Sequence, residues 1–116
     1  MKFAEAKRIA QNHIARLNLP KRMGGIVVQI TQYDDEDTLR FLKTEEPDIT
    51  LESQKLLNAA FAEEMSRRGA HVQFVPVNVA DYFSWLGRFN IKDGPANRAQ
   101  FISWLTAPEP KPTPLA

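Results

Sequence analysis

The sequence predicts a small α+β domain in which a sheet of two or three strands is covered by helices. Apolar side chains recur at helical spacing in four stretches of the chain. In two shorter runs, residues 26–33 and 71–77, successive side chains would point to opposite faces of a strand. Both runs are rich in β-branched residues, as strands are. The chain has 116 residues, enough for one domain with one core. We assign that domain to residues 1–106 and expect a disordered, proline-rich tail over residues 107–116.

The first helix is expected over residues 2–18, because most of its apolar side chains fall on one face. Strand 26–33 follows, and Asp34–Asp37 is too charged to be buried and reads as a turn. Apolar and polar side chains alternate over residues 38–43 well enough for this segment to form the second arm of a hairpin. The length of the turn before it favours that interpretation. The predicted order is then α-β-β-α-β-α-α.

An alternative for residues 38–43 is a short helix capped by an upstream aspartate. In that case the order is α-β-α-α-β-α-α. The strands 26–33 and 71–77 should then be parallel neighbours joined by a right-handed crossover.

The middle of the chain predicts a long helix followed by a strand. Thr50 is a suitable N-cap, and Gly69 is suited to the left-handed conformation that ends many helices. Between them, one stripe holds the apolar side chains that we expect to be buried: Leu51, Leu57, Phe61 and Met65. Two more helices should follow, one after the N-cap Asn78 and one starting at Pro95.

Composition and charge limit the function classes. The hydrophobic share of 43% and the charged share of 25% are ordinary for a soluble globular protein, and no apolar run is long enough to cross a membrane. The absence of cysteine excludes disulfides, cysteine-ligated zinc and thiol catalysis. We expect a cytoplasmic protein with no membrane partner, since the N-terminal stretch lacks the pattern of a secretory signal.

The C-terminal aromatic residues are the strongest candidate for an interaction surface. Two short helices would struggle to bury both tryptophans, and partly exposed aromatic rings are favoured anchors at protein interfaces. The interface candidates on these helices are Tyr82, Trp85, Phe89 and Trp104. The acidic turn, Asp34, Asp35, Glu36 and Asp37, would form an electrostatic rim to that interface.

No arrangement of residues indicates catalysis, a metal site or a cofactor. His13 and His71 have no partner at metal-ligand spacing, and the acidic turn lacks the glycine and glutamate of a calcium loop. An enzyme is therefore the least favoured hypothesis. The leading hypothesis is a small protein-binding or regulatory protein, bacterial or phage-like, which associates with another protein or with itself.

The alternative hypothesis is a nucleic-acid-binding accessory protein. Six of the seven charged residues among the first 22 are basic, although the net charge of the chain is only +1. Cations gathered in this way could neutralise nucleic-acid phosphates. The residues that would make these contacts are Lys7, Arg8, Arg16, Lys21 and Arg22.

Overall fold

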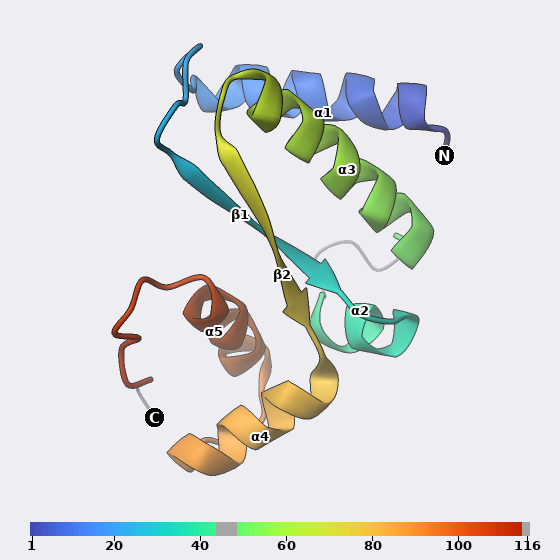
Figure 1. The fold of residues 1–116 in the computed structure, drawn as a ribbon. Helices are drawn as coiled ribbons and strands as arrows, with labels where there is room; N and C mark the ends of the chain where they lie inside the picture. The colour runs from blue at the N-terminus through green and yellow to red at the C-terminus, as the bar shows by residue number, and fades with distance from the viewer. Residues whose placement is uncertain (44–48, 115–116) are drawn as a thin grey trace.

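The computed structural model describes residues 1–43 and 49–114 and confirms an α+β fold. Seven elements follow one another along the described chain (Figure 1). They are α1 (Phe3–Leu17), β1 (Val27–Tyr33), α2 (Glu36–Leu42), α3 (Leu51–Arg67), β2 (His71–Val77), α4 (Val79–Phe89) and α5 (Pro95–Leu105). This is the alternative order, with residues 38–43 largely helical. The favoured hairpin is therefore wrong.

The two strands form a parallel pair with Val27 opposite His71 and Tyr33 opposite Val77. The chain between them passes through α2 and α3, as the alternative order requires. Figure 1 shows the sheet as the link between two groups of helices, with α1 and α3 at one end and α4 and α5 at the other. The molecule measures 42 × 33 × 21 Å, and its radius of gyration of 15.4 Å exceeds the roughly 13 Å typical of this chain length.

Helix α2 forms because the acidic turn supplies its cap. The Asp35 carboxylate accepts a hydrogen bond of 2.7 Å from the backbone N–H of Thr38, and this bond lowers the pKa of Asp35 below its ordinary value. Thr38 itself is fully buried, and its Oγ1 accepts a hydrogen bond of 3.2 Å from the N–H of Val79 at the start of α4. Sequence alternation suggested a strand here, but the cap and this contact 41 residues away stabilise a helix.

Helices α1 and α3 pack closely through small side chains. Ala6 and Ala10 of α1 and Ala60 of α3 are buried against one another. Nearer the sheet, Ile14 and Met65 are buried together. The predicted stripe on α3 is only partly correct, because Met65 is buried while Leu51, Leu57 and Phe61 are partly exposed. Gly69 ends the segment with φ of 95°, as its position predicts.

The largest cluster of buried residues lies at the other end of the sheet. It joins α2, α4 and α5 to the carboxyl ends of both strands. Its members are Tyr33, Leu39, Leu42, Val77, Tyr82, Trp85, Leu86, Ile91 and Phe101. The core is thus split between the two groups of helices, and the middle of the sheet lies between them.

The chain after α5 folds back on that helix. Nζ of Lys111 donates to the backbone oxygens of Trp104, Leu105 and Ala107 at 2.9–3.1 Å, and the indole N–H of Trp104 donates to the oxygen of Pro112. A cation at this place complements the negative end of the helix dipole. Disorder was predicted for residues 107–116, whereas the structure describes the tail up to Pro114 with these contacts to α5.

Candidate interaction site

The aromatic residues proposed as an interface lie mostly inside the core. Tyr82 and Trp85 are 0% and 3% exposed, because α2 and α5 cover them together with the strand ends. Phe89 and Trp104 are partly buried, and their rings lie 6.0 Å apart. Tyr82 and Trp85 could therefore reach a partner only if the core opened.

A hydrogen-bonded group that the sequence did not reveal holds α4 and α5 together. The Tyr82 hydroxyl donates to Asp93 at 2.7 Å, and the Arg98 guanidinium donates to both oxygens of the same carboxylate at 2.9 Å. These bonds, that from Arg98 most of all, hold the pKa of Asp93 well below its ordinary value. Burial raises the pKa of Tyr82. Arg98 also lies 3.8 Å from the centre of the Phe41 ring, so the group fixes helix positions.

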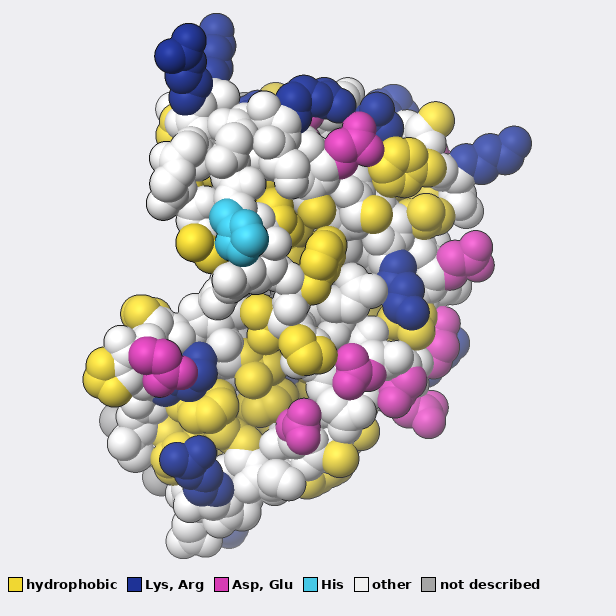
Figure 2. All heavy atoms as spheres, viewed as in Figure 1, with side chains coloured by type: hydrophobic (Ala, Val, Ile, Leu, Met, Phe, Trp, Pro, Cys, Tyr) yellow, Lys and Arg dark blue, Asp and Glu magenta, His cyan; other side chains and the backbone are white. Residues whose placement is uncertain are grey.

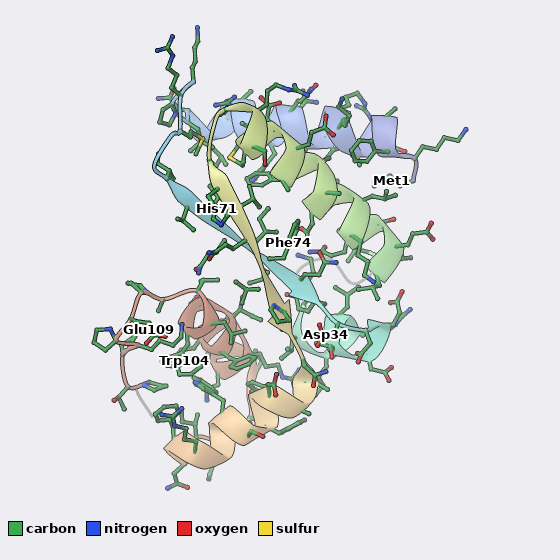
Figure 3. The ribbon with its side chains drawn as sticks, in the orientation of Figure 1. Met1, Asp34, His71, Phe74, Trp104 and Glu109 are labelled. Carbon is green, nitrogen blue, oxygen red and sulfur yellow. The ribbon has the colours of Figure 1, made fainter. Side chains whose placement is uncertain are left out.

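The four carboxylates of the acidic turn differ in their contacts. Asp35 caps α2, and Oε1 of Glu36 accepts a hydrogen bond of 2.9 Å from the N–H of Leu51. Asp34, labelled in Figure 3, is exposed and accepts a hydrogen bond of 3.4 Å from the side-chain amide of Asn78. Asp37 is also exposed. Within residues 1–43 and 49–114, no group of three or more histidine or acidic side chains could hold a metal ion.

The basic N-terminal residues are distributed over α1 and the loop that follows it. Lys7 lies 3.3 Å from Glu63 of α3 in an ion pair. Arg8 and Arg16 are exposed on α1, and Lys21 and Arg22 are exposed in the loop before β1. All five side chains therefore lie at the surface, and Lys7 is the one among them that makes an ion pair in the described chain.

The free edge of β1 is a feature that the sequence analysis did not identify. The N–H of His71 donates to the oxygen of Ile26, and the N–H of Asp34 donates to the oxygen of Val77, each at 2.9 Å. Parallel strands use alternate residues to bond one neighbour. Val27, Gln29 and Thr31 therefore direct their backbone N–H and C=O groups away from β2.

Most of these outward groups have no partner in the described chain. The side-chain amide of Asn58 donates to the oxygen of Thr31 at 3.1 Å. Among the described residues, no hydrogen bond reaches the outward backbone groups of Val27 or Gln29. Val27 also exposes 54% of its surface, a large fraction for an apolar side chain in a strand.

The outer edge of β2 differs from that of β1. By the same alternation, its outward residues are Val72, Phe74 and Pro76. Proline has no N–H to donate, and natural sheets use it to block a free edge. The outer edge of β2 thus lacks one donor, at Pro76, whereas the edge of β1 has no proline.

Hollows lie on both sides of the open edge of β1. The hollow on the side of α1 and α3 has a volume of about 430 Å³ and includes His13, Asn58 and Phe61 in its wall. The hollow on the side of the C-terminal tail has a volume of about 510 Å³ and is lined by Val27, Gln29 and residues 106–109 and 111. A third, of about 340 Å³, lies beside Thr31 and α5. Figure 2 shows the notch between the two groups of helices.

Comparisons with known proteins give no relative for this chain. No family model, curated protein or solved structure matches it. No helix in the described part of the chain is long and apolar enough to cross a membrane. A proposal for function therefore depends on the chain's own geometry.

Proposed function

We propose that this protein is a non-enzymatic interaction protein that binds an extended segment of a partner protein along the open edge of β1. The segment would become a third strand of the sheet. The single observation that supports this proposal most is the pair of unbonded residues, Val27 and Gln29, on an edge with space on both faces.

The geometry suits an added strand because strand side chains alternate between faces. A segment lying beside β1 would direct alternate side chains toward the hollow at α1 and α3 and toward the hollows at the tail and α5. Main-chain hydrogen bonds would supply affinity, and the hollows would supply selectivity. The side-chain amide of Gln54 and the side-chain oxygen of Asn58 in the first hollow would bond polar groups of the segment.

The test is the binding of peptides selected from a random library displayed on phage. The variant Gln29→Pro removes one outward N–H and leaves the bonds to β2 in place. The matched control, Phe74→Pro, makes the same change on the outer edge of β2, where the side chain is already 50% exposed. Circular dichroism and thermal melting would first show that both variants fold.

We expect the selected peptides to bind Gln29→Pro at least about tenfold more weakly than wild type, and Phe74→Pro about as well as wild type. Amide hydrogen exchange at Gln29 and Thr31 should slow on binding. Equal binding to wild type and Gln29→Pro, or protection confined to the aromatic helices, would contradict strand addition at β1.

Nucleic-acid binding is the second candidate function, supported by the four exposed cations Arg8, Arg16, Lys21 and Arg22. It predicts duplex binding whose affinity falls by close to one logarithmic unit per phosphate contact for each tenfold rise in salt. Replacing Lys21 and Arg22 with glutamine should reduce that slope by about two. No gel shift at low salt would refute this candidate.

A further inference from the structure

We propose that the segment bound at β1 is β1 of a second copy of this chain, running antiparallel, so that two copies form one four-stranded sheet. This inference rests on the proposed function, because it names the partner at the same edge. The strand order across the dimer would be β2-β1-β1-β2. Each copy would contribute the same residues on either side of a two-fold axis.

Charge at the ends of β1 is the first argument for a second copy. Lys21 and Arg22 are exposed before the strand begins, and Asp34 and Asp37 are exposed after it ends. Within the described ranges, none of the four makes an ion pair. Seven strand residues span about 23 Å, well beyond the screening length of about 8 Å at physiological salt. The two ends therefore do not neutralise each other within one copy.

An antiparallel arrangement brings these charges together twice. The acidic end of each strand would lie beside the basic end of the other, whereas a parallel arrangement would place like charges side by side. A pairing centred on Val28 places Val27 of each copy opposite Gln29 of the other. This pairing uses only the residues whose outward backbone N–H and C=O groups have no partner in the described chain. It also covers the exposed surface of Val27.

The two-fold symmetry of the pairing explains why association through β1 would stop at two copies, because each copy uses its β1 edge once. In the paired sheet, the outermost strands on both sides are β2, and each presents Pro76. An edge without a complete set of donors does not readily add another strand. Pairing through β1 therefore predicts a closed dimer in which the edge of β1 is no longer free, and Pro76 weakens further addition at β2.

The first experiment measures the mass of the protein in solution by sedimentation equilibrium over a range of concentrations. We expect a monomer–dimer equilibrium for wild type and for Phe74→Pro. In Gln29→Pro, the dissociation constant should rise at least about tenfold. A dimer of unchanged affinity in Gln29→Pro would place the interface elsewhere and overturn the inference.

The second experiment exchanges the charges. One variant carries Lys21→Glu and Arg22→Glu, and the other carries Asp34→Lys and Asp37→Lys; Asp35 stays because it caps α2. Each variant alone should dimerise at least about tenfold more weakly than wild type, since both contacts become repulsive. A mixture of the two should form a mixed dimer, because both contacts are then attractive again. A mixture that stays monomeric would overturn the antiparallel arrangement.

The outcomes separate this inference from the proposed function. If wild type stays monomeric up to about 1 mM, where binding is worth only about 4 kcal/mol, the second copy is not the partner. Strand addition then stands only if selected peptides still bind wild type and lose affinity for Gln29→Pro. If neither peptides nor a second copy depend on Gln29, both proposals fail.

Discussion

The buried hydroxyl of Thr38 should stabilise the fold by joining α2 to α4. Thr38→Val keeps the shape of the side chain but removes the acceptor for the N–H of Val79. That N–H is one of the four at a helix start that have no partner within the helix. The change therefore leaves a donor without its bond at the junction of two elements.

The size of the effect follows from the burial of this hydrogen bond. Leaving a buried donor unsatisfied costs about 1–3 kcal/mol, and the partial exposure of Val79 places the expected loss near 1–2 kcal/mol. For a domain of this length, the loss corresponds to a melting temperature about 3–10 °C lower. The control Thr38→Ser keeps the acceptor and loses one methyl group, worth about 0.8 kcal/mol.

A double-mutant cycle with Val79→Pro isolates the hydrogen bond. Proline is well tolerated at the first position of a helix and has no N–H, so Val79→Pro removes the donor directly. Free energies of unfolding for the four proteins come from denaturant titrations. We expect a coupling energy of about 1 kcal/mol between the two sites. The assigned role of Thr38 is refuted if Thr38→Val lowers the free energy of unfolding by the same amount in the Val79→Pro background as in wild type. It is also refuted if Thr38→Val does not lower the free energy of unfolding of wild type at all.

Three further predictions concern the packing of the protein and one charged contact at its surface. Phe101→Ala should lower the free energy of unfolding by about 3–5 kcal/mol, since Phe101 is 1% exposed; an unfolding curve close to wild type would contradict this. Phe61→Ala should cost clearly less in the same titration, because Phe61 lines a hollow. Asp93 has a lowered pKa, so its contribution is present above about pH 4 and is lost as the pH falls further. Melting measured against pH should show a smaller acid loss for Asp93→Asn than for wild type, and identical profiles would refute the role of Asp93.

Local patterns predicted most of the elements but not how they pair. Periodicity located α1, α3, α4 and α5, and β-branched runs located both strands. The interpretation of residues 38–43 was wrong because six residues are too few to distinguish alternation from helical spacing. The contact that fixes them, between Thr38 and Val79, joins residues 41 positions apart and is invisible in a local window.

The candidate site was harder to predict because it depends on backbone groups of a strand that have no hydrogen-bond partner. The sequence indicated aromatic residues as an interface, but Trp85 is buried by α2 and α5, which the local pattern could not place. The edge of β1 is open because the described sheet has no third strand. Which of its residues point outward follows from the alternation of the hydrogen bonds along the two parallel strands. A proline within a strand favours an edge position, but Pro76 lies in β2 and therefore gives no information about the open edge of β1.

The parallel pairing of the strands also has a consequence during synthesis. Val27 pairs with His71, which is 44 residues later in the chain. At about 5–20 residues per second, a ribosome needs roughly 2–9 s to make that stretch. Throughout this interval β1 has not yet paired with β2, so both its edges are exposed while α2 and α3 are being made. Nascent chains on one messenger would then be most prone to unwanted association before β2 emerges, and slowing translation over residues 49–71 should increase aggregation.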